Sequence, residues 1–562
     1  MRYLANHQGI LASAVYLLCI AIFFHSFIPD FATSLLGPPE DNLQDLWNTW
    51  YSQKVIVSDL RGFYFTHSIH YPEGSSLIYH SFSYSNLFLI FVIRTLLNLS
   101  LNINVLIGLH NLMILFSFFL AAIGTFYLAK YFTDNFFAAL IAGFIFSFSP
   151  FHVAHALHHM HVATIQYIPF FVLCFLKYIK EKTPVGFVGA VLFFVLNALS
   201  SFYYLMYNLF FVVFYYIYSL AVSKKVFIKD VLVRSGWILS CGVLLLAPLL
   251  IPMSLEAMRN ESVYAGGHDV YVADLFGLIV FHPYHLLATY VTPVHERLSG
   301  NAWEMSVYLG IANVALLTWS VVTREAFKLS GYLFCLSGIA FFMLFAVGSS
   351  LHVLGKTFAF PLLPTALMEH IPLLRNVRTP SRAIVYVYLF LALATGLAIK
   401  HLFFEKERYL SKWKTTYRLR PLLLGALSAF IFFDFYPANI ESTKVSCPPA
   451  YGIIRDDPSK TFGILDLPMT YISGNYYMMY QICHAKPIVH ATISRKLKKS
   501  LSDYLALTDF DSQRTQLKES HVKYIVIHKD LLSIEDAIDW EGYRKYYTAI
   551  YEDRQNTVFE VY

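Results

Sequence analysis

Hydrophobic and polar positions divide this chain into long apolar runs separated by polar stretches. At about 14 to 24 residues, each run is long enough to form an α-helix that crosses most or all of a bilayer. The runs lie at Gly9–Ile28, Leu87–Leu101, Val105–Leu128, Phe136–Ser149, Val162–Tyr178, Val185–Leu199, Tyr203–Val222, Val231–Ile251, Ser306–Val322, Tyr332–Val347, Ala383–Ile399 and Leu422–Phe435. This pattern predicts an α-helical polytopic membrane protein with about 11 to 12 transmembrane helices.

The composition agrees with this class of protein. Hydrophobic residues make up 57% of the 562 residues and charged residues only 14%, against roughly 25% charged residues in soluble domains. The first apolar run is longer than the hydrophobic region of a cleaved signal peptide, so we expect it to remain as a helix. A multi-pass protein of the cytoplasmic (inner) membrane is therefore expected.

The positions of Lys and Arg predict the orientation, since cytoplasmic loops are enriched in these residues. Four basic clusters are expected to be cytoplasmic: Lys177–Lys182, Lys224–Arg234, Arg324–Lys328 and Lys400–Arg420. The loops near 150–162, 253–304 and 350–381 then lie on the opposite side, with the N-terminus cytoplasmic and the C-terminus outside. This count requires Leu87–Leu101, which has Asn-rich flanks, to be an interfacial or re-entrant helix, so that about eleven helices span.

After Phe435 the pattern changes to short strand-like runs mixed with helical ones. The expected strands are Phe462–Leu467, Pro487–Ile493, Lys523–His528 and Thr557–Val561, and helical patterns include Leu501–Leu507 and Ser533–Trp540. We therefore expect two domains. Residues 1–437 form the transmembrane domain with a large first external loop at 30–83, and residues 438–562 form a small extracytoplasmic α/β domain.

The C-terminal domain carries no Gly-rich turn between strand and helix and no phosphate loop, so neither a nucleotide nor a nucleic-acid partner is expected. An accessory or lid role without chemistry is the simpler expectation for it. Cys447 and Cys483 can form a disulfide if this domain faces an oxidising compartment.

The external loop holds two acids, Asp41 and Asp45, four positions apart. On a helix both side chains would share one face. Leu46, Trp47 and Trp50 follow, and a Trp-rich amphipathic segment is expected to lie in the headgroup layer. A carboxylate there can accept a proton from an attacking hydroxyl. The alternative is a solvated loop whose acids only maintain solubility.

Five histidines follow Ser149–Pro150, at positions 152, 155, 158, 159 and 161. On a helix His152, His155 and His159 would share one face. Three hypotheses stay open for them: a metal site, contact with an anionic or sugar substrate, or a structural role. Imidazoles three or four positions apart suit zinc, but no nearby Glu supplies the usual companion base.

Two further polar clusters stand at helix ends on the external side. Glu304 precedes the run that begins at Ser306, where it is either a functional acid or an ordinary acid at a helix N-terminus. Arg375, Arg378 and Arg382 precede the run at Ala383. Cations outside oppose the positive-inside trend and need an anionic partner, either a specific phosphate or lipid headgroups in general.

The order of these parts resembles the class C (GT-C) glycosyltransferases, integral membrane enzymes that use polyprenyl-phosphate sugars. The Asp41/Asp45 loop, with its HYPEG stretch at 70–74, matches the position of that superfamily's catalytic first external loop. The Ser149–Pro150 turn is similar to the segment before the second external loop, and the RTPSR stretch at 378–382 resembles bacterial members. Many members place an acid where this chain has histidines, so we expect a reaction without a metal or other cofactor.

The resemblance implies an inverting transfer in which Asp45 or Asp41 deprotonates the acceptor hydroxyl and Glu304 orients hydroxyl groups. Asp45 is preferred because Leu46 and Trp47 would anchor it. The implied ligands of the donor phosphate are Arg378, Arg382, Arg375, His155 and His159. The implied partners are a polyprenyl-phosphate-linked sugar donor, a glycan, lipid or protein acceptor, and membrane lipids.

A transporter or flippase of lipid-linked saccharides is the alternative from another class. It would need ionisable or broken helices near the bilayer midplane, whereas the apolar runs here are almost free of ionisable residues. A non-enzymatic membrane assembly factor that acts through its C-terminal domain is a third hypothesis.

Overall fold

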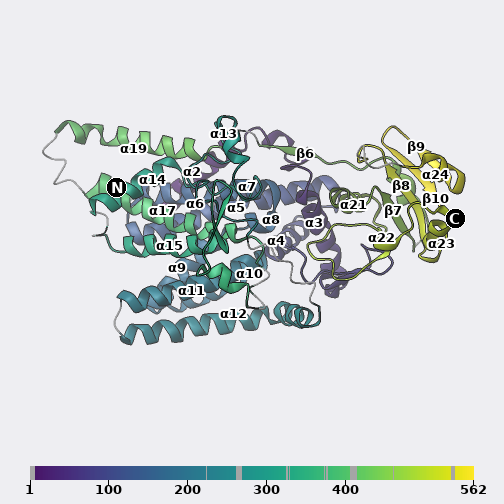
Figure 1. Ribbon diagram of the computed structural model, residues 1–562. Helices are drawn as coiled ribbons and strands as arrows, with labels where there is room; N and C mark the ends of the chain where they lie inside the picture. Colours follow the sequence, from purple (N-terminus) through teal and green to yellow (C-terminus); the bar gives the residue numbers. More distant parts are fainter. Residues whose placement is uncertain are drawn as a thin grey trace. The chain divides into compact units, whose positions relative to one another are not determined.

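The structure is a computed structural model of the chain. It describes residues 7–222, 225–260, 269–324, 327, 329–371, 374, 377–405, 414–438, 440–459, 461–532 and 538–562. The chain divides into two compact units, which Figure 1 shows with their elements labelled. Unit 1 comprises Met1–Pro29, Leu112–Leu250 and Tyr264–Glu441, and unit 2 comprises Asp30–Asn111, Ile251–Val263 and Ser442–Tyr562.

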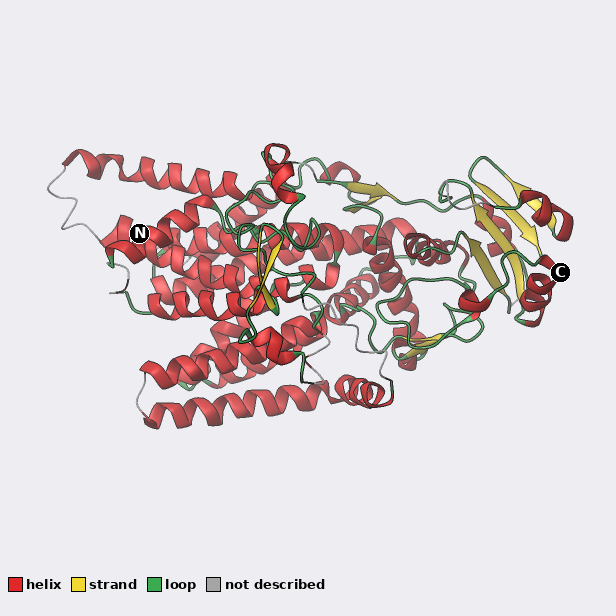
Figure 2. Ribbon diagram, viewed as in Figure 1, coloured by secondary structure: helices red, strands yellow, loops and turns green. Residues whose placement is uncertain are grey.

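Unit 1 is built almost entirely of helices (Figure 2). Its helical elements are α2 (Gln8–Phe23), α5 (Ile103–Thr133), α6 (Phe136–Ser147), α7 (Pro150–His158), α8 (Met160–Ala163), α9 (Tyr167–Glu181), α10 (Pro184–Ser200), α11 (Phe202–Val222), α12 (Lys225–Arg259), α13 (Ala288–His295), α14 (Ile311–Thr323), α15 (Tyr332–Ala346), α16 (Pro364–Met368), the 3₁₀ turn η6 (Pro380–Ala383), α17 (Ile384–Lys400), the π-turn η7 (His401–Glu405) and α19 (Lys414–Phe435). The start of α5, residues 103–111, and the end of α12, residues 251–259, belong to unit 2. A hairpin of β4 (Ser350–Val353) and β5 (Lys356–Ala359) accompanies them.

The predicted helical membrane architecture is confirmed, since a helix covers most of every apolar run in the sequence. Six helical stretches among the described residues are long and apolar enough to cross a bilayer: Ile103–Thr133, Phe136–His158, Met160–Glu181, Phe202–Val222, Phe227–Arg259 and Pro380–Glu405. The number of helices that span, and the interfacial placement of the Leu87–Leu101 run, stay predictions.

Helix α17 forms the centre of unit 1. Every residue from Ile384 to Ile399 is buried, which requires a helix that is apolar on all sides. Small residues allow its neighbours to approach closely. A Cβ at Gly338 of α15 would lie 2.6 Å from the Phe390 ring, and a Cβ at Gly396 would lie 3.1 Å from the Ala138 carbonyl of α6.

Unit 2 combines the first polar loop with the C-terminal segment. Its elements are β1 (Ser34–Leu36), α3 (Asp41–Ser58), the 3₁₀ turn η2 (Leu60–Phe63), β2 (Phe65–Thr66), β3 (Ser75–Ser76), α4 (Tyr84–Leu96), β6 (Ser442–Lys444), α20 (Ala450–Asp456), β7 (Gly463–Leu467), α21 (Tyr471–His484), α22 (Leu501–Tyr504), α23 (Phe510–Glu519), β8 (Val522–His528), α24 (Trp540–Tyr546), β9 (Thr548–Glu552) and β10 (Asn556–Glu560). The antiparallel pair β1–β6 joins residues 34–36 to residues 442–444.

A four-stranded sheet organises the C-terminal part, in the order β7–β8–β10–β9. Strands β7 and β8 are parallel, while β8–β10 and β10–β9 are antiparallel. Three of the expected strands are present as β7, β8 and β10, and β9 was not anticipated. The Ser533–Trp540 helical pattern falls mostly outside the described residues.

The expected strand Pro487–Ile493 is wrong. The segment makes only an isolated parallel bridge between Ile488 and Ile464 of β7. The backbone groups of Ile488 bond to the first loop, where the Tyr71 N–H donates to the Ile488 carbonyl at 3.0 Å and the Ile488 N–H donates to the Ser68 carbonyl at 3.0 Å. The segment thus connects the C-terminal sheet to the N-terminal loop instead of continuing as a strand.

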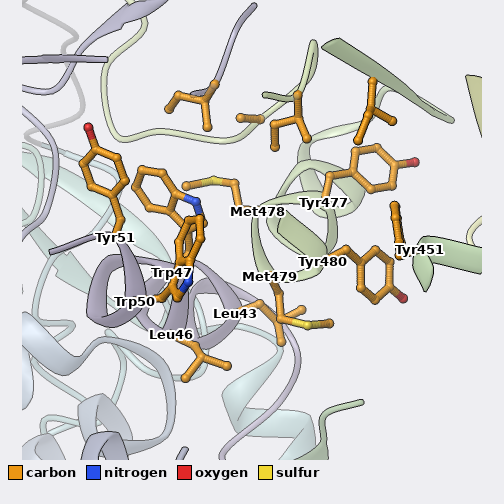
Figure 3. Packing of buried hydrophobic residues seen from close by; sticks show 14 of the residues in the cluster. Leu43, Leu46, Trp47, Trp50, Tyr51, Tyr451, Tyr477, Met478, Met479 and Tyr480 are labelled. Carbon is orange, nitrogen blue, oxygen red and sulfur yellow. The ribbon is translucent and has the colours of Figure 1, made fainter. Parts of the chain in front are cut away.

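The tryptophans of the first loop are buried inside unit 2, which corrects their expected place in the headgroup layer. Trp47 is 0% exposed and stacks on Tyr51 with 4.5 Å between ring centroids. Its Nε1 donates a hydrogen bond to Gln481 Oε1 of α21 at 2.6 Å. Figure 3 shows Trp47 and Trp50 of α3 beside Met478 of α21 in this core. The apolar face of α3 therefore packs on protein.

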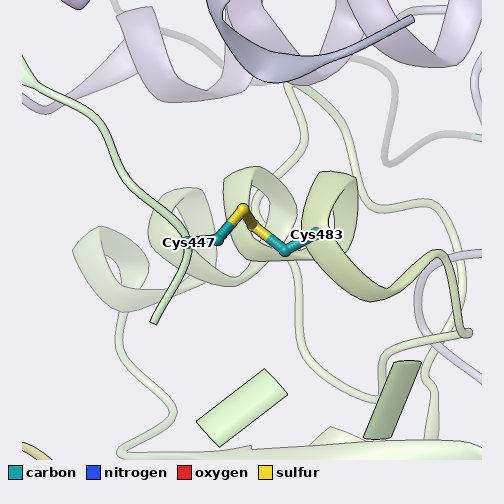
Figure 4. Close-up of a disulfide and its surroundings, with 2 residues drawn as sticks. All are labelled: Cys447 and Cys483. Atoms are coloured by element: carbon teal, nitrogen blue, oxygen red, sulfur yellow. A yellow bond between two sulfur atoms is a disulfide. The ribbon is translucent and has the colours of Figure 1, made fainter. Parts of the chain in front are cut away.

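Cys447 and Cys483 form a disulfide, with their Cα atoms 5.7 Å apart. It ties the chain segment before α20 to the last turn of α21 (Figure 4). Cys19, Cys174, Cys241 and Cys335 are free thiols.

Candidate active site

A buried ion pair between Glu304 and Arg382 is the centre of the polar site in unit 1. Arg382 Nε and Nη2 both donate to Glu304 Oε1, at 3.0 and 2.7 Å, and Ser381 Oγ donates to Oε2 at 2.8 Å. The two charged residues are only 3% and 8% exposed. Buried charges persist when they are paired and hydrogen-bonded, and these contacts meet that requirement.

Local sequence explains how these groups are held. Pro380 opens the 3₁₀ turn η6 that places Ser381 and Arg382 directly before the buried helix α17. On the other chain segment, Asn301 Oδ1 accepts the Glu304 N–H at 3.0 Å and so fixes the turn that carries the acid. Both partners of the ion pair therefore have a fixed backbone.

His155, on helix α7, also lies near Glu304. Its Nε2 is 3.8 Å from Glu304 Oε2, and its Nδ1 is 3.3 Å from Nδ1 of His159. Ser149 caps α7 and Pro150 occupies its first turn, as is common at helix starts. The structure thus brings together four of the predicted site residues: His155, His159, Glu304 and Arg382.

Partly exposed aromatic and imidazole groups adjoin this buried pair. His158 Nε2 lies 2.7 Å from the Tyr284 hydroxyl, and the His158 ring centroid is 4.2 Å from that of Trp303. His159 lies farther from Trp303, with 6.2 Å between ring centroids. Trp303, Tyr284 and His159 are partly exposed, so this edge of the site is open to solvent.

The guanidinium of Arg382 also packs on an aromatic ring. Its Cζ lies 4.8 Å from the centroid of Tyr203, at the start of α11, and the Tyr203 hydroxyl donates to Thr379 Oγ1 at 3.1 Å. Arg378 is exposed. Arg375, the third arginine of the predicted cluster, lies outside the described residues.

His152 does not belong to the site, so the predicted shared face of His152, His155 and His159 is wrong. Its Nδ1 lies 2.6 Å from the Ser147 carbonyl and its Nε2 lies 2.9 Å from Ser117 Oγ. The ring stacks on Phe118 at 3.8 Å. Helix α7 ends at His158, so the five histidines do not continue along one helix. Among the described residues, no group of three or more His, Cys, Asp or Glu side chains is placed to hold a metal ion.

Asp41 and Asp45 belong to unit 2, where α3 begins at Asp41. Asp41 is partly exposed, whereas Asp45 is 5% exposed. Asn48 Nδ2 donates to Asp45 Oδ1 at 3.2 Å, and Thr49 Oγ1 donates to the Asp45 carbonyl at 3.0 Å. The two acids, one turn apart, therefore differ in their access to solvent.

His80 is a buried histidine that contacts Asn48, the hydrogen-bond partner of Asp45. The sequence pattern alone did not identify it. Burial lowers the pKa of His80 to about 3, so its ring is neutral at physiological pH. Its Nε2 lies 2.7 Å from Asn48 Oδ1, and the Ser494 N–H donates to Nδ1 at 3.5 Å. This pattern fits one neutral tautomer that donates from Nε2 and accepts at Nδ1. His80 thus connects the acidic helix to the segment near residue 494.

The basic end of unit 1 lies one helix length from the ion pair. Helix α11 has 21 residues, or about 31 Å at 1.5 Å per residue. At its first turn Tyr203 contacts Arg382, and at its last turn Val222 lines a cavity of about 650 Å³ that Lys180 also lines. This separation is close to the roughly 30 Å thickness of a hydrocarbon core.

No family model matches the sequence, and no curated protein is significantly similar to it. Its structure is similar to that of the Archaeoglobus fulgidus oligosaccharyltransferase in the apo form, with a TM-score of 0.54 and 12% identity over 98% of this chain and 74% of that chain.

Two other solved structures are similar over nearly the whole chain. ArnT from Cupriavidus metallidurans, bound to undecaprenyl phosphate, has a TM-score of 0.50 and 11% identity and covers 98% of each chain. The arabinofuranosyltransferase AftD from Mycobacteria has a TM-score of 0.55 and 12% identity, with 100% of this chain matching 40% of that longer one. The chain therefore has the fold of the class C (GT-C) membrane glycosyltransferases.

Proposed function

We propose that this chain is an inverting membrane glycosyltransferase that moves a sugar from a polyprenyl-phosphate donor to an acceptor hydroxyl at the extracytoplasmic face. Its fold is shared with ArnT, which was solved with undecaprenyl phosphate, and with the oligosaccharyltransferase AglB, which was solved with a dolichol-phosphate. A donor that consists of a lipid, a phosphate and a sugar requires cationic groups at the bilayer surface and a polar site for the sugar.

The observation that carries the proposal is the fixed Glu304–Arg382 pair beside an exposed arginine. Arg382 donates to Glu304 through Nε and Nη2, and its Nη1 makes no hydrogen bond to any residue that the structure describes. Arg378, four positions earlier, is exposed. Arg378 is therefore the better candidate for direct contact with the donor phosphate, and Arg382 adds a pre-oriented positive group.

Two observations support the extracytoplasmic side. The end of unit 1 that carries Lys180 is the end where basic loops collect, and such loops favour the cytoplasm. The ion pair lies at the other end of α11. In unit 2, the disulfide between Cys447 and Cys483 is typical of an oxidising compartment. Both indicate that sugar transfer takes place outside the cytoplasm.

The proposed reaction is a single displacement at the anomeric carbon. A carboxylate, either Asp41 or Asp45, accepts the proton of the acceptor hydroxyl while that oxygen forms its bond to the anomeric carbon. The bond between this carbon and the phosphate oxygen breaks, and the polyprenyl phosphate leaves with the electron pair. Positive groups stabilise the charge on the leaving phosphate.

Of the two acids, we propose Asp41 as the base, in place of Asp45, which the sequence favoured. A base must reach the acceptor hydroxyl, and Asp41 is partly exposed while Asp45 is buried beside Asn48. The expectation that Asp45 is the base depends on Leu46 and Trp47 as interfacial anchors, but both side chains are buried in a protein core. Asp45 is better suited to a structural role in α3, where its carboxylate accepts a hydrogen bond from Asn48.

The partly exposed edge formed by Trp303, Tyr284 and His159 is proposed to contact the sugar. An indole face with neighbouring hydroxyl and imidazole groups offers an apolar surface and hydrogen bonds together, which a sugar ring requires. Glu304 and His155, at the base of this edge, would orient the sugar hydroxyls.

The test of this function compares Arg378→Ala with the matched control Arg297→Ala, another exposed arginine of unit 1. With purified protein and a polyprenyl-phosphate sugar, we expect Arg378→Ala to raise the KM for the donor about ten-fold or more, while the control retains wild-type values. Equal kinetics for both variants would remove Arg378 from the site. Uptake of the intact sugar lipid into vesicles without transfer would instead indicate a transporter.

A further inference from the structure

A basic stretch of unit 2 lies at the point where helix α12 ends. The stretch contains Arg495, Lys496, Lys498 and Lys499. Lys496 forms a salt bridge with Asp503, with 2.5 Å between Nζ and Oδ2. Lys498 and Lys499 are exposed and make no ion pair with any described residue. Two exposed cations therefore stand side by side in a segment that has no role in the proposed reaction.

Hydrogen bonds fix this stretch to the end of α12. Asn260 Nδ2 donates to the Leu497 carbonyl, between the lysines, at 3.4 Å. The Tyr79 hydroxyl donates to the carbonyl of Met253, which lies about two helical turns before Asn260. Ser494 Oγ donates to Ser81 Oγ at 3.0 Å and holds the start of the stretch. The lysines are thus carried by anchored backbone next to the helix end.

The end of α12 presents apolar side chains to its surroundings. Ile251, Leu255 and Met258 are 58%, 46% and 83% exposed. Their spacing of four and three positions places them on one face of the helix. Arg259, beside Met258, is also exposed. An exposed apolar face bordered by cations has the composition of a segment that lies in a membrane interface.

The length of α12 supports the same placement. The helix has 35 residues, or about 52 Å, which exceeds the roughly 30 Å hydrocarbon core. Only 17% of its most apolar window is buried within the protein, against 94% for the α17 stretch, so α12 faces lipid. Ile251–Arg259 directly follows the apolar run and is therefore expected at headgroup depth.

We propose that this surface, formed by the α12 face of Ile251, Leu255 and Met258 together with Lys498, Lys499 and Arg259, docks unit 2 onto the headgroup layer of a bilayer that contains anionic phospholipids. The apolar face enters the interface and the cations contact lipid phosphates. None of the residues of this surface has a role in the proposed sugar transfer. Each cation near an anionic membrane surface raises the affinity roughly five-fold.

The first test measures binding of short-chain phosphatidylglycerol and phosphatidylcholine to the full-length protein in detergent. We expect tighter binding of phosphatidylglycerol, weakened about ten-fold or more in Lys498→Glu/Lys499→Glu and unchanged in Lys518→Glu, an exposed lysine on α23. Lys498→Ala/Lys499→Ala provides the same comparison if the charge reversal prevents folding. Unchanged binding in the alanine variant would overturn the proposal.

The second test locates the apolar face. Met258→Trp in vesicles should show fluorescence that brominated phospholipids quench, beyond the quenching of the parent protein. No additional quenching would place this face in water and contradict the proposal. Equal affinity for soluble heparin and for phosphatidylglycerol would also contradict it, because the surface would then be a site for a soluble polyanion.

Discussion

At the scale of single residues, the pairing of Glu304 with Arg382 makes each side chain depend on the other. Replacing Glu304 by Gln would leave a buried guanidinium without its counter-charge, which typically costs about 3–5 kcal/mol. We expect Glu304→Gln to lower the thermal unfolding midpoint of the purified protein markedly, while Glu296→Gln, an exposed acid of the same unit, does not change it. Equal midpoints for the two variants would show that the pair does not stabilise the fold.

The two aspartates of α3 give a second residue-scale prediction. If Asp41 is the base, Asp41→Asn should lower the transfer rate about 100-fold or more at an unchanged unfolding midpoint. Asp45→Asn should lower the rate much less, because an amide oxygen at this position can still accept the Asn48 hydrogen bond. A larger loss of rate in Asp45→Asn would return the role of base to Asp45.

Much of the residue-level site follows from the sequence, but its pairings do not. Acids and arginines at the ends of long apolar runs are unusual enough to identify Glu304 and Arg382 separately. That they bind each other across 78 positions of sequence is a property of helix packing, which no local pattern encodes. His80 was missed because a single histidine in a polar loop carries no signal until burial is known.

At the scale of elements, α3 depends on the C-terminal part of unit 2 for its stability. Trp47 is fully buried and bonds to Gln481 of α21. Trp47→Ala should cost about 3–5 kcal/mol and increase amide hydrogen exchange in α21, whereas Trp237→Ala, on the exposed side of α12, should leave this exchange unchanged. Unaltered exchange in Trp47→Ala would show that the two helices are not coupled.

The apolar runs predict the helices well because lipid solvation demands a long, uncharged sequence whatever the tertiary contacts are. The polar loop is the opposite case. Its mixture of polar and apolar residues is also typical of a solvated helix, and Trp47 and Trp50 suit an interface as well as a core. Only the packing of α3 on α21, some 430 positions later in the chain, decides between these two interpretations.

At the scale of the whole molecule, the buried histidines of unit 2 predict an acid-sensitive fold. Burial lowers the pKa of His70 to about 4, of His80 to about 3 and of His484 to about 4. The unfolded chain has an ordinary histidine pKa near 6.5 and takes up these protons first. Stability should therefore fall as the pH drops from about 6.5 toward 4, by about 1.4 kcal/mol per pH unit for each histidine.

Thermal unfolding between pH 8 and pH 5 checks this prediction. His80→Asn should make the decline below pH 6.5 less steep, while His521→Asn, an exposed histidine of the same unit, should leave it unchanged. A decline that is equally steep in His80→Asn would mean that other groups cause the acid sensitivity.

Sugar transfer from a lipid phosphate is the activity on which the proposed roles of the site residues depend. The most direct measurement incubates the purified wild-type protein with a panel of polyprenyl-phosphate sugars and acceptors and detects both the glycosylated acceptor and the released polyprenyl phosphate. We expect the two products in equal amounts, with inverted anomeric configuration, and about 100-fold less of both with Asp41→Asn. Product with retained configuration, or undiminished transfer when both Asp41 and Asp45 are replaced by Asn, would contradict the proposed mechanism.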